Sequence, residues 1–192
     1  MHPLRQHFEE LLSLTDEEFD YIASHFTPLS LKKNDFLPHE GKIVTHEYWV
    51  VKGLLKTYFL DANGKEHIVQ FAMGNWWVTD YQAFFGKKKA TLNICCLKDT
   101  ELLAITYTDK EKLCDELPHF NTFHRHKCNM GYAAQQRRIL SLLSDDARTR
   151  YEQFVALYPS LLQRLPKSLI ASYLGVSRET LSRLYFSSHT KK

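Results

Sequence analysis

The segment from Leu169 to Leu184, which reads LIASYLGVSRETLSRL, constrains the fold more than any other stretch of the chain. Its apolar residues have the spacing that packs two short helices against each other. These residues are Ile170, Leu174, Val176, Leu181 and Leu184. Gly175 falls between the two halves, where a residue without a Cβ adopts a positive φ at little cost, and Ser177 is a favourable N-cap for the second half. The segment therefore predicts a helix-turn-helix.

The second predicted helix carries polar residues on one face, because side chains three and four positions apart are neighbours on a helix. These residues are Arg178, Glu179, Ser182 and Arg183. An arginine can bond a guanine edge with two hydrogen bonds, and a glutamate can accept one from cytosine N4. Lys167 and Ser168, at the start of the first helix, are candidates for phosphate contact. The pattern favours a helix that reads DNA over a solvated surface helix or a protein-interaction module.

At these residues the chain resembles the Crp/Fnr family of bacterial transcription regulators. The run SRETLSR is similar to the recognition helix of that family, and Glu179-x-x-Ser182-Arg183 resembles its fumarate–nitrate branch in particular. The resemblance implies that Glu179, Ser182 and Arg183 contact bases. Arg178 matches a position that contacts DNA in the catabolite-activator branch, so the resemblance implies a DNA contact there too.

The composition is that of a globular protein, with 44% hydrophobic and 24% charged residues among 192. No apolar run is long enough to span a bilayer, and the N-terminus lacks the pattern of a signal peptide, so we expect a cytoplasmic protein that contacts no membrane. The net charge is only +3, but Arg and Lys gather from Arg137 to Lys192. This distribution suits phosphate contact, although a charge run is more often a solvated surface.

The chain divides into three sections by pattern. Residues 1–115 contain helical runs followed by short β-type runs, with a strong hairpin signal at residues 61–64, Asp-Ala-Asn-Gly. Such a succession predicts an antiparallel sandwich or jelly-roll barrel. The resemblance implies that this section is a cyclic-nucleotide-binding-like sensor barrel.

Residues 116–144 have an imperfect helical pattern without proline after Pro118, which predicts a long helix across about Pro118–Leu143. The helix is a candidate dimer seam, as the family resemblance favours, or else packs on the barrel. Residues 145–192 form the helix-turn-helix section, and few residues follow Phe186, so we expect a winged-helix-like domain with a reduced wing. The expected fold class is therefore α+β.

The effector region of the barrel departs from the family pattern. The family binds a cyclic phosphate with a Gly-Glu pair and a following Arg, whereas here Thr79-Asp80 stands at the pair and Lys89 is the nearest cation to the Arg position. We therefore expect an effector other than cyclic AMP, or none; a cyclic-nucleotide-responsive regulator is the alternative. The tentative pocket residues are Trp76, Trp77, Asp80, Tyr81 and Lys89, although aromatic residues of this kind are more often barrel core.

Cysteine and histidine patterns argue against a metal centre. The cysteines lack zinc-site spacing, and none precedes Cys95, so the N-terminal iron–sulfur cluster of the fumarate–nitrate branch is not expected. A cupin-like metal enzyme would carry an H-x-H pair in the strand region, and none occurs there. No motif for catalysis is present, so we expect that the protein is not an enzyme. The sequence does not identify a cofactor. The expected partners are double-stranded DNA with palindromic half-sites, a second copy of the chain, and RNA polymerase.

Overall fold

The structure is a computed structural model that describes residues 2–37 and 40–189, with side chains as far as residue 185; Lys191 and Lys192 of the basic C-terminal section lie outside the described residues. The chain forms two compact units. We call the first, which comprises Met1–Phe59 and Gln70–Cys128, the barrel unit. The second, which comprises Leu60–Val69 and Asn129–Lys192, is the helical unit.

The barrel unit begins with two short helices, α1 (Pro3–Glu9) and α2 (Asp16–Ser24). Thr15 caps α2 by accepting a hydrogen bond from the backbone N–H of Glu18, whose carboxylate bonds back to the N–H of Thr15. This reciprocal pair satisfies two backbone donors at the start of the helix. The two helices confirm the helical runs that the sequence predicts at the start of residues 1–115.

Two antiparallel sheets follow, as the spacing of the β-type runs predicts. One sheet has the order β1 (Thr27–Leu31), β7 (Thr100–Thr106), β2 (His46–Lys52) and β5 (Trp77–Val78). The other has the order β4 (Glu66–Met73), β3 (Leu54–Leu60) and β6 (Asn93–Cys96). Buried side chains from both sheets, such as Val50, Leu55 and Ile94, form a shared core. The section is the predicted jelly-roll-like barrel.

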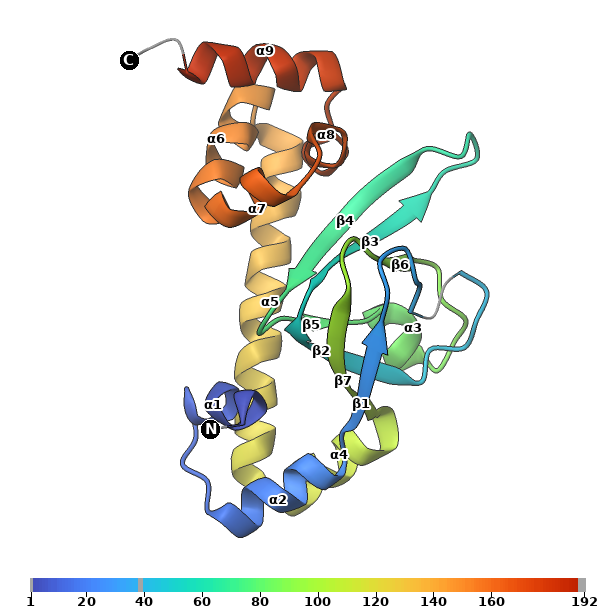
Figure 1. The fold of residues 1–192 in the computed structure, drawn as a ribbon, viewed down its shortest axis with the longest axis vertical. Helices are drawn as coiled ribbons and strands as arrows, with labels where there is room; N and C mark the ends of the chain where they lie inside the picture. Colours follow the sequence, from blue (N-terminus) through green and yellow to red (C-terminus); the bar gives the residue numbers. More distant parts are fainter. Residues whose placement is uncertain (1, 38–39, 190–192) are drawn as a thin grey trace. The chain divides into compact units, whose positions relative to one another are not determined.

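A second core lies outside the sheets, where α1 packs beside the first turns of α5 (Pro118–Ser144) (Figure 1). Its fully buried members include Phe8 of α1, Trp49 of β2 and Phe120 of α5, and Leu113 of α4 (Tyr107–Glu116) joins them. A third, small cluster surrounds Phe84 of α3 (Tyr81–Gly86). The barrel thus uses one face of its first sheet to hold the start of α5.

Helix α5 has 27 residues, and its bounds confirm the predicted long helix to within one residue. Its first part, through Cys128, belongs to the barrel unit, and the remainder belongs to the helical unit. The second part leaves large apolar side chains between 42% and 79% exposed. These are Met130, Tyr132, Ile139, Leu140, Leu142 and Leu143.

The helical unit completes its fold with α6 (Ala147–Leu157), α7 (Pro159–Arg164), α8 (Lys167–Leu174) and α9 (Arg178–His189). The sequence predicts a helix from Asp146 to about Tyr158 that Pro159 ends; Asp146 is the N-cap of α6, and Pro159 also begins α7. Pro166 is the N-cap of α8 and not its first residue. None of the described helices is both long and apolar enough to cross a membrane.

Candidate nucleic-acid interface and effector region

The turn between α8 and α9 has the geometry that the sequence predicts. Gly175 ends α8 with φ of 67°, and its backbone N–H points to the carbonyl oxygens of Ala171 and Ser172. The N–H of Val176 bonds the Ala171 oxygen at 3.0 Å. Ser177 caps α9, because its Oγ accepts a hydrogen bond from the N–H of Thr180 at 3.1 Å. The left-handed glycine and the serine cap together fix the direction in which α9 leaves the turn.

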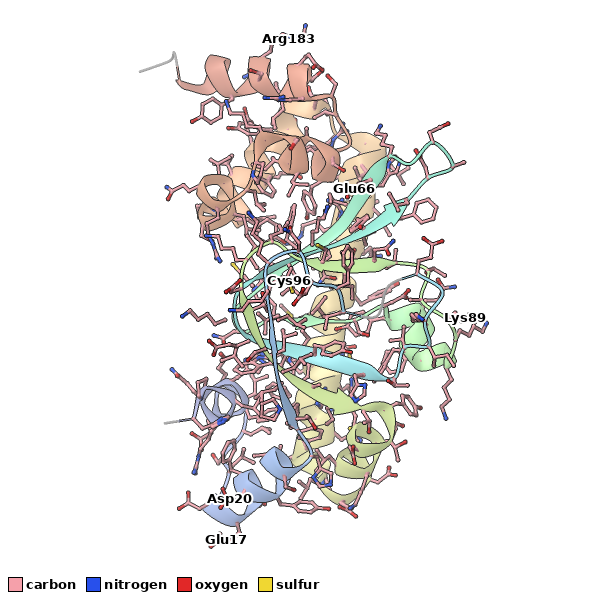
Figure 2. All side chains as sticks on the ribbon, turned by 45° about the vertical axis from the view of Figure 1, so that its right-hand side comes forward. Glu17, Asp20, Glu66, Lys89, Cys96 and Arg183 are labelled. Carbon is pink, nitrogen blue, oxygen red and sulfur yellow. The ribbon has the colours of Figure 1, made fainter. Side chains whose placement is uncertain are left out.

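The apolar side of the helix-turn-helix is buried, and this determines which side of α9 remains free. Ile170, Ala171 and Leu174 of α8 and Leu181 of α9 are all buried. Because Leu181 points inward, the residues on the other side of α9 point outward. Figure 2 shows Arg183 projecting outward from α9. Arg178 and Glu179 are also exposed, whereas Ser182 is half-buried.

Charge on this outward face is mixed, and Glu179 is held in its ionised form. The pKa of the Glu179 carboxyl is lowered, first by a hydrogen bond from its own backbone N–H, then by the Ser177 hydroxyl and by the charges of Arg178 and Arg183. A carboxylate accepts hydrogen bonds and cannot donate them. Glu179 is therefore suited to accept from an exocyclic amino group.

Lys167 and Ser168, the candidates for phosphate contact, are both exposed on the first turn of α8. The Lys167 ammonium lies 3.9 Å from the centre of the Tyr185 ring, a cation–π contact that joins α8 to α9. The contact places the lysine beside the second helix and leaves its head exposed.

Two arginines hold the end of α8, and the sequence analysis missed their role. The Nε–H of Arg150 donates to the Leu174 oxygen at 2.9 Å, and its Nη1 donates to the Asp145 oxygen at 2.7 Å. Arg138 of α5 donates to the backbone carbonyl oxygen of Tyr173 at 2.9 Å, and its guanidinium lies 3.6 Å from the centre of the Tyr173 ring. The last carbonyls of a helix lack partners within it, so such donors stabilise the turn.

The outer end of the β3–β4 hairpin belongs to the helical unit and is bonded to α8. Ser172 donates from Oγ to the Glu66 oxygen at 2.7 Å and accepts from the Ile68 N–H at 3.2 Å. Arg138 also donates to the Ile68 oxygen at 2.9 Å. Two side chains from helices thus pair with the backbone of one strand, and neither partner lies near in sequence.

The helical unit carries the excess positive charge. By sequence it contains 11 Lys and Arg against 6 Asp and Glu, whereas the barrel unit contains 14 against 16. The modest net charge of the chain therefore conceals a basic helical unit beside a slightly acidic barrel unit. A local excess of this kind attracts a polyanion.

Asp80, a tentative pocket residue, has a structural role instead. Its carboxylate is only 2% exposed and accepts hydrogen bonds from four donors. These are the N–H of Ala83 at 3.2 Å, the N–H and Oγ of Thr91 at 2.8 and 3.1 Å, and the N–H of Leu92 at 3.1 Å. The carboxylate thus caps α3 through Oδ1 and links it through Oδ2 to the segment that enters β6, so both oxygens already accept hydrogen bonds.

The other tentative pocket residues are not gathered around one point. Trp76 packs against the core between the sheets, whereas Trp77 packs against the core that holds α1 and α5. Tyr81 donates its hydroxyl proton to Glu47 at 3.0 Å, and Glu47 pairs with the buried Lys110. Lys89 is exposed. Sequence reasoning missed the Glu47–Lys110 pair, because its members are 63 positions apart.

Burial raises the pKa of the Cys96 thiol, and it raises the pKa of the Cys114 thiol to about 11. Within the described ranges, no three His, Cys, Asp or Glu side chains form a group that could hold a metal ion.

Comparison with known proteins relates this architecture to a known class. Residues 28–116 match the family model of the cyclic nucleotide-binding domain. No curated protein matches the sequence. Among solved structures, FixK2 from Bradyrhizobium japonicum has a TM-score of 0.73 at 20% identity, covering 86% of this chain and 85% of that one.

Two further structures show the same fold. A putative transcriptional regulator of the Crp/Fnr family from Eubacterium rectale has a TM-score of 0.69 at 17% identity, covering 92% of this chain and 85% of that one. The catabolite activator protein of Thermus thermophilus has a TM-score of 0.55 at 20% identity, with coverage of 93% and 85%. Residues 28–116 are therefore similar to a cyclic nucleotide-binding domain, and the chain has the same fold as these regulators. These structural neighbours are transcription regulators and not enzymes.

Proposed function

We propose that this protein is a sequence-specific DNA-binding transcription regulator. The observation that carries the proposal is the outward face of α9, where Arg178, Glu179 and Arg183 are exposed above a buried, capped helix-turn-helix. A helix held in this way can enter the major groove with its polar side toward the bases. The basic excess of the helical unit supplies the electrostatic attraction that DNA binding needs.

Within this proposal each residue has a distinct part. Glu179 and Arg183 dominate base recognition, Ser182 tunes it, and Arg178 contacts a base or a phosphate. Lys167 and Ser168 contact the phosphate backbone, so they affect affinity and its salt dependence more than sequence preference.

We also propose that two copies pair through the second part of α5. Its exposed apolar side chains, including Ile139, Leu140 and Leu143, would be buried by a second helix of the same kind. Two helix-turn-helices related by twofold symmetry would bind palindromic half-sites about one helical turn apart. In this scheme residues 1–115 sense, 116–144 dimerise and 145–192 bind DNA, in the cytoplasm and in contact with RNA polymerase.

The proposed effector is a small molecule other than cyclic AMP, or none. A buried cyclic phosphate needs a charged partner that donates hydrogen bonds, because its desolvation otherwise costs several kcal/mol. Both carboxylate oxygens of the buried Asp80 already accept protein hydrogen bonds, and Lys89 lies at the surface. A cyclic-nucleotide-responsive regulator is the second candidate, favoured by the family match across residues 28–116.

Selection from random duplexes tests the DNA-binding proposal. We expect an enriched palindrome with the wild-type chain and a relaxed preference at one position of each half-site with Arg183→Ala. An exposed lysine of the barrel unit, Lys98, provides the matched control, since Lys98→Ala should leave the selected site unchanged. Recovery of no common site would refute DNA reading, and a protein-interaction module would then be the better hypothesis.

Calorimetric titration with cyclic AMP and cyclic GMP tests the effector proposal. We expect no heat of binding at micromolar concentrations. Micromolar binding that disappears in Lys89→Ala would show that the lysine reaches the ligand, and the second candidate would then replace the first.

A further inference from the structure

His7 of helix α1 is buried beside the core that α1 shares with β2 and the start of α5. The side chain is 3% exposed and lies among aromatic rings of three other elements. Ring centres lie 5.4 Å away at Trp49, 6.3 Å away at Trp77 and 5.3 Å away at Phe123. Its neighbours on α1, Leu4 and Phe8, are fully buried in the same core. The histidine therefore sits at the centre of the contact that keeps α1 in place.

The hydrogen bond made by His7 requires a neutral ring of one tautomer. The indole Nε1–H of Trp77 points to Nε2 of His7 at 3.1 Å. An indole nitrogen can only donate, so Nε2 must accept and cannot carry a proton. The ring proton of neutral His7 is therefore assigned to Nδ1, which lies 3.6 Å from the Glu10 carboxylate.

We infer that protonation of His7 releases α1 from the core that it shares with Trp49 and the start of α5, so that packing of this helix responds to acid. An imidazolium carries protons on both nitrogens. The second proton would point at the N–H of Trp77, so the hydrogen bond would be lost. The new charge would lie among aromatic rings with little access to water, which is costly. Departure of α1 relieves both conflicts.

The charged groups around His7 do not supply a free counter-ion. From α1 itself, Glu10 faces the ring, but Lys127 of α5 bonds that carboxylate at 2.9 Å. The His124 ring of α5 lies 5.3 Å from the Trp77 ring, and the charge of Lys110 of α4 lowers the pKa of His124. The pKa of His7 is lowered by burial first and by Lys127 second, with Glu10 opposing them. The pKa of the buried His124 is lowered too.

The sign and size of the pH effect follow from these facts. While α1 is packed, burial and the bond from Trp77 favour neutral His7, and once α1 leaves the imidazole regains a pKa of about 6.5. Below that pH the released helix binds one more proton, so the equilibrium for packing falls by up to tenfold per pH unit. Between pH 7.5 and 5.0 one histidine can contribute at most about a thirtyfold change. Exposure of His124 with the same core would increase it.

Release of α1 would uncover the first turns of α5. Phe120 and Phe123 of α5 are fully buried, and both contact Phe8 of α1, with ring centres 5.5 and 4.8 Å apart. Protonation of His7 would thus change the packing at the start of α5. No occupant of the barrel is required.

Hydrogen exchange on the full chain at pH 7.5 and 5.0 tests the inference. After correction for the intrinsic exchange rates, we expect the protection of the α1 amides to fall at pH 5.0 by up to about thirtyfold from His7 alone. His7→Gln should remove the share of this loss that His7 contributes, because the Gln amide oxygen can accept from Trp77 but does not titrate. His126→Gln, at an exposed histidine of α5, should behave as the wild type does. Equal protection at both pH values, or an undiminished loss in His7→Gln, would overturn the inference.

A second measurement on the unmodified protein covers failure of the variant to fold. The indole proton resonance of Trp77 should move toward its free position with the same midpoint as the loss of α1 protection. Loss of protection while that resonance stays unchanged would assign the response to another group and refute the role of His7.

Discussion

Replacement of Asp80 by alanine tests whether this carboxylate is a structural element of the barrel unit. The variant would remove the acceptor of four hydrogen bonds, three of them from backbone N–H groups, at a position that is 2% exposed. A hydrogen bond to a charged group contributes about 1.5–3 kcal/mol, and loss of a helix cap alone costs about 1 kcal/mol. Because the donors share one carboxylate and Thr91 can reach water, the contributions do not add fully.

We therefore expect Asp80→Ala to lower the free energy of unfolding of the barrel unit by about 3–5 kcal/mol. Asp80→Asn keeps one acceptor oxygen and should lose less. Denaturant titration followed by tryptophan fluorescence is the appropriate assay, since all three tryptophans lie in the barrel unit. A loss below about 1 kcal/mol for the alanine variant would refute the structural role, because that is the contribution of a single ordinary hydrogen bond. Asp80 would then be free to meet a ligand.

Three further predictions concern the interface, the barrel and the proposed seam. Arg183→Ala should weaken binding to the selected duplex by about 1–3 kcal/mol, whereas Lys167→Ala should mainly reduce the slope of affinity against salt by about one, as measured by titration at several salt concentrations. Gly53→Ala should destabilise the barrel unit strongly in a denaturant titration, because φ is 136° and a Cβ would lie 2.4 Å from Oγ1 of Thr100; Gly41→Ala, with nothing within 4 Å, should cost far less. Leu143→Glu should yield folded monomers in analytical ultracentrifugation, since the side chain is exposed in the single chain. A stable dimer of this variant would contradict the proposed seam.

Features that depend on neighbouring residues were predictable from the sequence. Gly175 and Ser177 mark a turn and a cap through their own backbone and side-chain chemistry, and Thr15 does so for α2. The length of α5 follows from a long stretch without proline. The short elements α3, α4, α7, β1 and β5 were not predicted, because they carry too few residues to show a period and depend on packing.

The roles of Ser172 and Arg138 could not be predicted, because their partners lie far away in sequence. Ser172 bonds Glu66, which is 106 positions away, and Arg138 bonds Ile68, which is 70 positions away. The composition of a segment does not show which polar side chain will meet which backbone group. For Asp80, the sequence does not show that its carboxylate bonds Thr91 and Leu92, which lie 11 and 12 positions away.

Residues 60–69 belong to the helical unit although they interrupt the barrel unit in the sequence, and this limits how the protein can be divided into fragments. The polypeptide leaves the barrel unit after Phe59, returns at Gln70 and leaves again after Cys128. A fragment that begins at Asn129 would therefore lack the strand backbone to which Ser172 and Arg138 bond. A fragment that ends at Cys128 would carry a hairpin end without its helical partner. The helix-turn-helix could therefore not be moved to another protein as one continuous segment, because residues 60–69 would have to be moved with it.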